Sequence, residues 1–244
     1  MVLFGSSQKR TKELKLEACI ETIEEAKAAA EHGLNRVELC AALDLGGLTP
    51  SAALIEASSK IIETHVMIRP RAGNFVYSTE ELVLMKLDIE IAAKLGATGV
   101  VFGCLTETKE VDVESSLPLL EKAKSLGLTV TFHRAFDFLF DMQMGLDQLL
   151  AMGFNRLLTS GGQINAYNGL NQIMALITQA NGRIEIMAGS GVNAENIKKI
   201  KAAGVDAAHF SIQKKRIGMA SLSMGAQYDV DESKIKSVLN ALEA

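Results

Sequence analysis

Residues 33–40, with the sequence GLNRVELC, contain the pattern that decides the fold. A glycine comes first, a run suited to a buried strand follows, and a polar or thiol side chain ends it. Glycine accepts the left-handed backbone at the end of a helix, and buried parallel strands are rich in Val, Ile and Leu. The pattern therefore predicts a strand entered from a helix, and it recurs at residues 96–104, 127–134, 153–160 and 204–211.

Strand and helix patterns alternate eight times along the chain. Ser/Thr-x-x-Glu capping boxes should begin helices at Thr22 and Ser78, and another helix should open at Thr49 with Pro50 in its first position. A helix over residues 112–125 should start late or kink at Pro118, and a closing amphipathic helix should contain residues 235–242. The expected strands are residues 14–19, 35–40, 65–69, 99–103, 129–133, 156–159, 184–187 and 206–210.

Eight such units of roughly thirty residues favour an α/β fold, the (β/α)8 TIM barrel. No Pro/Gly/Ser-rich linker interrupts the series, so we expect a single domain over residues 1–244, with residues 1–13 as a short N-terminal extension. The rival fold is an open doubly wound sheet, which usually has a glycine-rich turn after its first strand. No such turn follows Cys19.

The bulk composition argues against several partners. The chain of 244 residues has a formal charge of -4 and scattered lysines and arginines, which predicts no nucleic-acid partner. No apolar run approaches the ~20 residues of a membrane-spanning helix, and the N-terminus lacks a signal-peptide pattern. We therefore expect no membrane partner and a cytoplasmic location. Three cysteines, an odd number, predict reduced thiols rather than a disulfide framework.

Alternation along the expected strands separates two faces. The apolar face should contact the helices and comprises Leu16, Ala18, Val37, Leu39, Val66, Ile68, Val130, Phe132, Ile184 and Ile186. The other face should point into the barrel and is polar, with Glu17, Cys19, Glu38, Cys40, Arg69, Thr131, His133, Glu185, His209 and Ser211. Unpaired buried charges are costly, so these groups should pair with one another or with a ligand. This face predicts a site at the C-terminal ends of the strands.

Several sequence runs closely resemble the CutC family, in order, from about Leu16 to Tyr228. They are VELC at 37–40, GGLTPS at 46–51, MIRPR at 67–71, TFHRAFD at 131–137 and LTSG at 158–161. The resemblance implies a cytoplasmic, homo-oligomeric TIM barrel with a role in copper homeostasis, and copper as a bound ion. Two runs depart from the family. Residues 71–75 are RAGNF where the family usually has RGGDF, which removes an acidic group, and the glycine turn GSG at 189–191 is a variant form.

A copper(I) site is the first functional hypothesis. Cys19 and Cys40 should end neighbouring strands, which lie ~4.8 Å apart. Metal–thiolate bonds of roughly 2.3 Å would let the two sulfurs hold one soft ion, with His209 on the eighth strand as a third ligand. The alternative is that inward cysteines fill the core as small apolar residues. Cys104, on the fourth strand, should be too distant to join.

An enzyme site is the second hypothesis. Arg69, Arg71 and Arg134 offer donors for an anion, as does the turn formed by Gly189, Ser190 and Gly191 before Asn193, an expected helix N-cap. His133 suits proton transfer, and Glu38 or Glu17 could act as a base or orient it. Asp137 is either a catalytic group, a partner of Arg134 or a helix cap. The alternative is a structural ion-pair network of these arginines and carboxylates.

Two functions from different classes therefore remain open. One is a cytoplasmic copper-homeostasis protein that binds copper(I) at the barrel mouth. The other is a lyase, isomerase or hydrolase whose small anionic metabolite is held by Arg69, Arg134 and the glycine turn. The sequence leaves undecided whether the protein is an enzyme.

Overall fold

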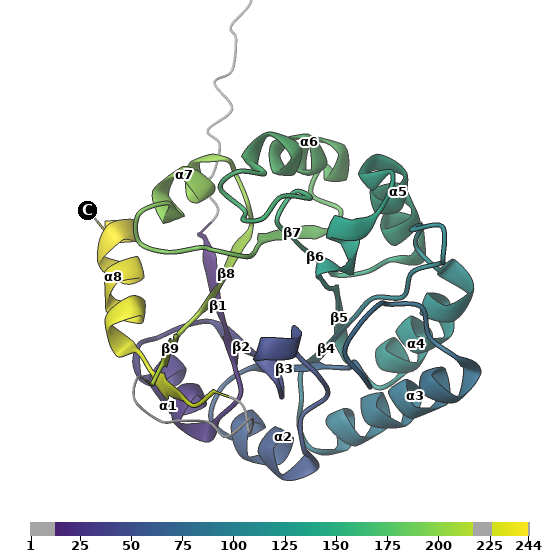
Figure 1. The fold of residues 1–244 in the computed structure, drawn as a ribbon, viewed down its shortest axis with the longest axis horizontal. Helices are drawn as coiled ribbons and strands as arrows, with labels where there is room; N and C mark the ends of the chain where they lie inside the picture. The colour runs from purple at the N-terminus through teal and green to yellow at the C-terminus, as the bar shows by residue number, and fades with distance from the viewer. Residues whose placement is uncertain (1–12, 217–225, 244) are drawn as a thin grey trace, which may run out of the picture.

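The computed structural model describes residues 13–216 and 226–243, so almost all of the expected N-terminal extension lies outside the described residues. Eight parallel strands close into a barrel in chain order, and the helices surround it (Figure 1). The predicted single-domain (β/α)8 TIM barrel is thus confirmed. The strands are β1 (Lys15–Ile20), β2 (Arg36–Leu39), β3 (Thr64–Met67), β4 (Gly99–Phe102), β5 (Thr129–Phe132), β6 (Arg156–Thr159), β7 (Glu185–Ala188) and β8 (Ala207–Ser211).

The helices follow the strands in alternation. They are α1 (Ile23–Glu31), α2 (Ala52–Ser59), α3 (Thr79–Lys94), α4 (Val113–Ser125), α5 (Met142–Met152), α6 (Leu170–Ala180), α7 (Ile197–Ala202) and α8 (Glu232–Glu243). Two 3-10 turns, η1 (Leu43–Leu45) and η2 (Arg134–Phe138), follow β2 and β5. An antiparallel ribbon of β9 (Gln213–Lys215) and β10 (Tyr228–Val230) precedes α8. None of the described helices is long and apolar enough to cross a membrane.

Local capping explains where several helices begin. Thr22 with Glu25, and Ser78 with Glu81, form both predicted capping boxes. The helix expected at Thr49 instead begins at Ala52, with Ser51 as its N-cap. The reason is that the Thr49 hydroxyl accepts a hydrogen bond from the Arg69 backbone N–H at 3.0 Å, which ties Thr49 to the end of β3.

The helices α4 and α7 begin at residues that differ from the predicted ones. α4 begins at Val113, directly after its N-cap Asp112, and continues through Pro118, so the expected late start was wrong. The expected N-cap Asn193 was also wrong, because α7 begins at Ile197 and Asn193 lies in the preceding turn. There its side-chain oxygen accepts a hydrogen bond from the Glu195 backbone N–H at 2.9 Å.

The predicted alternation of faces holds around the barrel. The helix-facing residues belong to one large buried apolar cluster with the inner faces of the helices. Inside the barrel, two inward positions have no side chain: Gly99 begins β4, and Gly103 directly follows it. A Cβ on Gly99 would lie 2.6 Å from His65 Cδ2, and one on Gly103 would lie 2.7 Å from His133 Nδ1. These glycines therefore make room for two imidazole rings.

Charged side chains fill the N-terminal half of the barrel interior. Glu17 faces Arg36 on β2 and His209 on β8, and the Arg36 guanidinium pairs with the Glu17 carboxylate. Arg36 Nη2 also lies 2.6 Å from Glu185 Oε1, which is 3.1 Å from Arg156 Nε. Arg156 donates to the Thr129 hydroxyl at 3.0 Å. The expectation that inward charges pair with one another is confirmed at this end of the barrel.

Replacing Arg36 by Met should destabilise the fold, because the buried Glu17 carboxylate would lose its guanidinium partner. We expect the free energy of unfolding to fall by about 3–5 kcal/mol, the usual cost of leaving one member of a buried ion pair alone. Urea unfolding followed by circular dichroism measures this change. The matched control is Arg216→Met, which breaks the exposed pair of Arg216 with Asp229 and should leave the unfolding midpoint nearly unchanged. Equal losses in both variants would contradict a stabilising role for the interior pairs.

Candidate functional site

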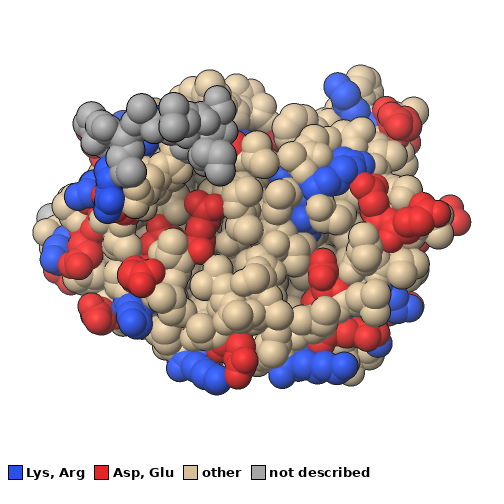
Figure 2. Space-filling model, turned by 60° about the horizontal axis from the view of Figure 1, so that its bottom comes forward, with Lys and Arg blue, Asp and Glu red and all other residues tan. Residues whose placement is uncertain are grey.

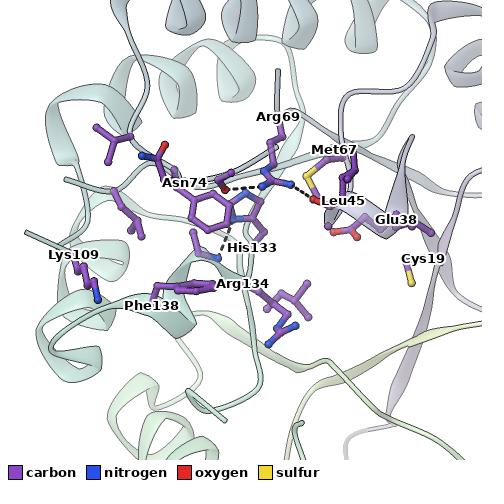
Figure 3. Close-up of a pocket in the computed structure, with 18 of the residues that line it drawn as sticks. Cys19, Glu38, Leu45, Met67, Arg69, Asn74, Lys109, His133, Arg134 and Phe138 are labelled. Carbon is purple, nitrogen blue, oxygen red and sulfur yellow. Dashed lines mark hydrogen bonds between the residues drawn. The ribbon is translucent and has the colours of Figure 1, made fainter. Parts of the chain in front are cut away.

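A cavity of about 680 Å³ opens at the C-terminal ends of the strands. Cys19, Glu38 and His209 line it from β1, β2 and β8, and the loops after β2, β3, β4 and β5 supply most of the remaining wall. Figure 3 shows Glu38 and Cys19 on one side, and Arg69 with His133 on the other. The cavity therefore lies where parallel barrels carry their sites.

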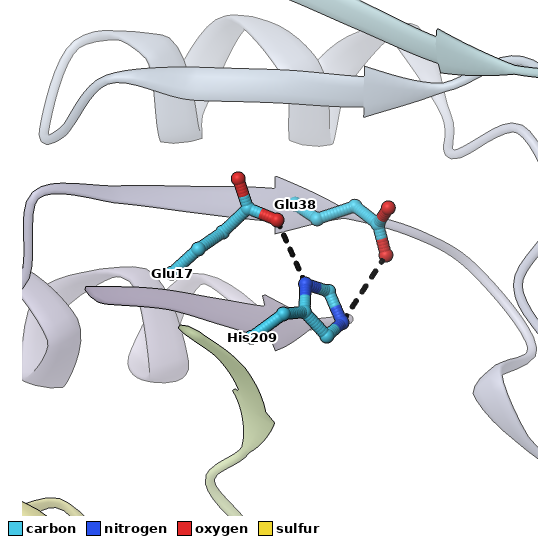
Figure 4. Close-up of side chains that lie close together, drawn as sticks. All are labelled: Glu17, Glu38 and His209. Atoms are coloured by element: carbon cyan, nitrogen blue, oxygen red, sulfur yellow. Dashed lines mark hydrogen bonds and ion pairs between the residues drawn. The ribbon is translucent and has the colours of Figure 1, made fainter. Parts of the chain in front are cut away.

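A row of three acid–base groups lies at the inner end of this cavity (Figure 4). His209 Nδ1 is 2.7 Å from Glu17 Oε1, and His209 Nε2 is 3.7 Å from Glu38 Oε2. All three side chains are buried, and their ligand atoms lie within 4.8 Å of one another. The strand order explains the arrangement, because β8, β1 and β2 are consecutive neighbours in the barrel.

The environments of the two carboxylates push their pKa values in opposite directions. Burial acts against ionisation of Glu17, but the hydrogen bond from His209 and the charge of Arg36 hold its pKa well below the usual range. Burial raises the pKa of Glu38, and the negative charge of Glu17 adds to this effect. Burial opposes a charge on His209, yet Glu38 and Cys19 raise its pKa well above 6.5. Glu17 is thus a fixed anion, and Glu38 is the carboxyl group suited to exchange a proton.

His133 behaves differently from His209. Burial, and then the charge of Arg69, lowers the pKa of His133 to about 3. Its Nδ1 accepts a hydrogen bond from the Ala135 backbone N–H at 3.3 Å, so the neutral ring carries its proton on Nε2. The Nε2 atom is buried and has no protein partner, and the residue lines the cavity. His133 therefore presents an unused hydrogen-bond donor there.

Three buried polar atoms of cavity residues lack a protein partner: Glu38 Oε1, Arg69 Nε and His133 Nε2. An unsatisfied buried polar group costs roughly 1–3 kcal/mol. The cavity thus combines one unused acceptor with two unused donors, which suits a ligand that carries both kinds of group.

Three of the four other N–H donors of Arg69 are engaged by the protein itself. Its Nη1 donates to the carbonyl oxygens of Leu45 at 2.9 Å and Gly47 at 3.0 Å, and its Nη2 donates to Gly73 at 2.9 Å. The guanidinium also lies 5.0 Å from the centre of the Phe75 ring. Arg69 therefore joins the loops after β2 and β3, and only part of the guanidinium predicted to bind an anion is available.

Arg71 holds its own loop together. It forms a bidentate pair with Glu81 and donates to the carbonyls of Ala72, Asn74 and Val76. Arg71 is not among the residues that line the cavity. The structure thus separates it from Arg69 and Arg134, with which it was grouped as a predicted anion-binding residue.

Arg134 and Asp137 form a pair at the edge of the cavity. Arg134 Nε donates to Asp137 at 2.8 Å, and its Nη2 donates to the Ser160 hydroxyl at 3.1 Å. The Asp137 carboxylate also accepts hydrogen bonds from Thr159, Ser160 and Gly162 after β6. Of the three roles considered for Asp137, the structure shows that of a partner for Arg134. Arg134 itself lines the cavity.

The glycine turn after β7 is divided between two places. Gly189 lies close to His209, because a Cβ on it would be 3.5 Å from His209 Cδ2. Gly191 lines a second, smaller hollow with Ser211 and Lys234. The structure therefore does not bring Gly191 into the cavity that contains Arg69 and Arg134.

The two cysteines predicted to bind metal have different surroundings. Cys19 lines the cavity, and its thiol donates to the Phe210 carbonyl at 3.6 Å. Cys40 is fully buried with Met67 and Val101, and its thiol donates to Glu38 Oε2 at 3.6 Å. Burial, and then the charge of Glu38, raises the pKa of Cys40 well above its usual value. The close donor set is thus two carboxylates and an imidazole rather than thiolates, which is a harder set than copper(I) prefers.

Sequence analysis did not identify the apolar wall of the cavity. Phe75 and Phe138 lie in the loops after β3 and β5, and Leu45 lies in η1. Loop residues have no periodic pattern, so alternation along strands could not find them.

The charges on the face seen in Figure 2 are interspersed over its described part and do not gather by sign.

Together, these features define a single-domain (β/α)8 barrel with a ligand-sized cavity at its mouth and a buried acid–base row beside it. The sequence model of the CutC family matches residues 14–214. The chain therefore belongs to the CutC family.

Individual relatives agree with this assignment. A family protein CutC of Vibrio atlanticus is 42% identical over 227 residues, which cover 91% of this chain and 92% of the relative. Another, from Bacteroides thetaiotaomicron, is 41% identical over 247 residues and covers 96% and 98% of the two chains. A solved structure from Streptococcus agalactiae, described as a proposed copper homeostasis protein CutC, is 38% identical with a TM-score of 0.77, and the match covers 81% of this chain and 98% of that one.

The two cavity histidines should differ in protonation near neutral pH. We expect His209 to be an imidazolium with both ring nitrogens protonated, and His133 to be neutral with its proton on Nε2, because their pKa values move in opposite directions. Long-range ¹H–¹⁵N spectra of the four histidines, assigned with single His→Gln variants, measure this. Titration of His133 near 6.5 would contradict the expected difference.

The raised pKa of His209 also has a consequence for stability. Protonated His209 stabilises the folded state through its two carboxylate partners. This stabilisation is complete below the unfolded-state pKa of about 6.5 and is lost as the pH rises through the higher folded-state pKa. The difference in unfolding free energy between the wild type and His209→Gln should therefore shrink as the pH rises above neutrality.

Proposed function

We propose that this protein is an acid–base enzyme that moves a proton next to the carbonyl group of a small metabolite. The observation that carries the proposal is that two residues lining one cavity each have a buried polar atom without a protein partner: the carboxyl oxygen Glu38 Oε1 and the neutral donor His133 Nε2. A base and a hydrogen-bond donor that face the same ligand are the two groups that enolisation requires.

The proton transfer can be written with named atoms. Glu38, as the carboxylate, takes a proton from the carbon next to the carbonyl group, and the electron pair of that C–H bond forms the enolate. The carbonyl oxygen gains negative charge and accepts hydrogen bonds from His133 Nε2–H and Arg69 Nε–H. Glu38 exchanges this proton with water and returns one to the same carbon, which gives exchange. In a hydroxy ketone, return to the former carbonyl carbon, with transfer of the hydroxyl proton to the former carbonyl oxygen, gives isomerisation.

The surrounding charges support these roles. Glu38 has a raised pKa, which brings it closer to the operating pH where a general base is most effective. His209 stabilises the Glu38 anion from 3.7 Å, and Glu17 fixes the orientation of His209 from the other side. Glu17 and His209 are therefore positioning residues in this scheme, because neither needs to touch the substrate.

The proposal revises the expected substrate-binding residues. Arg69 and Arg134 remain at the cavity, whereas the part of the glycine turn at Gly191 lies elsewhere. Arg69 acts in the proposal as a source of positive charge and of one unused N–H donor, and not as a free bidentate fork.

Replacing Glu38 by Gln should abolish most of the activity. We expect the rate of exchange of the substrate's α-proton with deuterium oxide to fall by about 10²–10⁴, the usual contribution of a general base. Exchange into a panel of 2-oxo acids and hydroxy ketones, followed by NMR, measures it. The control is Glu110→Gln in the loop after β4, a carboxylate outside the cavity lining, which should exchange at the wild-type rate. Exchange by Glu38→Gln at the wild-type rate, or no exchange with any compound, would refute the proposal.

Copper(I) binding is the second candidate, and the position of Cys19 favours it. The Cys19 thiol lines the cavity and interacts with His209, so a soft sulfur and an imidazole lie together. Cytoplasmic copper homeostasis by a homo-oligomer is the role that the family resemblance suggests. Cys40 would have to lose its proton beside Glu38 to join as a second thiolate, which weakens this candidate.

If copper(I) binds here, Cys19→Ser should lower its affinity at least about tenfold, because the accessible thiolate is lost. Competition with a copper(I) chelator under anaerobic, reducing conditions measures this affinity. Cys104→Ser removes a buried thiol outside the cavity and should have no effect. Unchanged affinity in the double variant Cys19→Ser, Cys40→Ser would exclude a copper site at these residues.

A further inference from the structure

We propose that the substrate of this cavity carries an aromatic or large branched apolar group beside its carbonyl. The inference rests on the proposed function for the identity of the polar head, and it concerns the rest of the molecule. It makes Phe138 a residue that determines specificity.

The first argument is the composition of the wall. Eight large apolar side chains from four loops and from the strands line the cavity: Leu43, Leu45, Met67, Phe75, Val76, Leu105, Phe138 and Leu158. Asn74, Thr106, Glu107 and Lys109 add polar groups to its wall. Its volume of about 680 Å³ lies within the ~300–1,000 Å³ of pockets that hold drug-sized ligands. A three-carbon metabolite would leave most of this apolar surface in contact with water.

The second argument is a series of aromatic rings that leads from the rim to the reactive groups. Phe138 is 58% exposed, and its ring centre lies 5.7 Å from that of Phe75. The Phe75 ring in turn lies 4.9 Å from the His133 imidazole in an edge-to-face arrangement. A ligand ring placed against Phe138 and Phe75 would cover exposed apolar surface and set its carbonyl near His133 Nε2.

Isothermal titration with two probes tests the inference on the full-length protein. Phenylpyruvate has an aromatic group beside a 2-oxo acid, and pyruvate has the same head without the ring. We expect phenylpyruvate to bind at least about tenfold more tightly than pyruvate. Equal affinity for the two 2-oxo acids, or no binding of phenylpyruvate at millimolar concentration, would overturn the inference.

A pair of variants tests whether the phenyl ring of phenylpyruvate binds against Phe138. Phe138→Ala should weaken phenylpyruvate binding roughly tenfold and leave pyruvate binding unchanged. The matched control is Phe140→Ala, because Phe140 lies two residues further on, is 90% exposed and is not among the cavity residues. Equal effects of the two variants would reject the role of Phe138.

Deuterium exchange at C3 of each 2-oxo acid separates this inference from the proposed function, with Glu38→Gln as the background. Tight, Phe138-dependent binding without exchange would reject the proposed function and keep the inference. Exchange into pyruvate as fast as into phenylpyruvate would keep the proposed function and reject the inference.

Discussion

The pairing of one buried carboxylate, Glu17, is the constraint on which the rest of the structure depends. An isolated anion inside a protein is prohibitively costly, so Glu17 requires cationic partners from both sides. Arg36 on β2 and His209 on β8 supply them, and these strands are the two neighbours of β1. The same contacts join the last strand to the first and turn His209 toward Glu38. Barrel closure and the orientation of the acid–base row thus share one cause.

The barrel interior changes character along its axis. At the N-terminal end, Arg36, Arg156 and Glu185 satisfy one another almost completely. At the mouth, Glu38 and His133 each keep a buried polar atom without a protein partner. A structural ion-pair network and a ligand site were alternatives when judged from the sequence, but they are two ends of the same interior. Complete pairing provides rigidity, and incomplete pairing provides the capacity to bind.

The sequence was sufficient for the fold because buried strands and the glycines before them repeat with a regular period. Alternation then identified Glu17, Glu38, His133 and His209 as inward residues. It could not show which donors of an arginine are already used, since Arg69 donates to backbone carbonyls of loops and Arg71 donates to such carbonyls and to Glu81. Loop conformation also decides that Phe138 lines the cavity, which the sequence did not predict. It places Gly191 in the second hollow, away from Arg69 and Arg134, with which it was predicted to bind an anion. Local patterns predict elements, whereas loop conformation decides which groups remain free.

Gly99 of β4 and Gly103 directly after it have an unusual part in the chemistry. Neither has a side chain, and the His65 and His133 rings occupy the space that side chains would take. The position of the buried His133 ring consequently depends on a neighbour that makes no polar contact with it. Selection at these glycines would act against any added carbon atom, so two positions without functional groups would be as restricted as the residues that exchange protons.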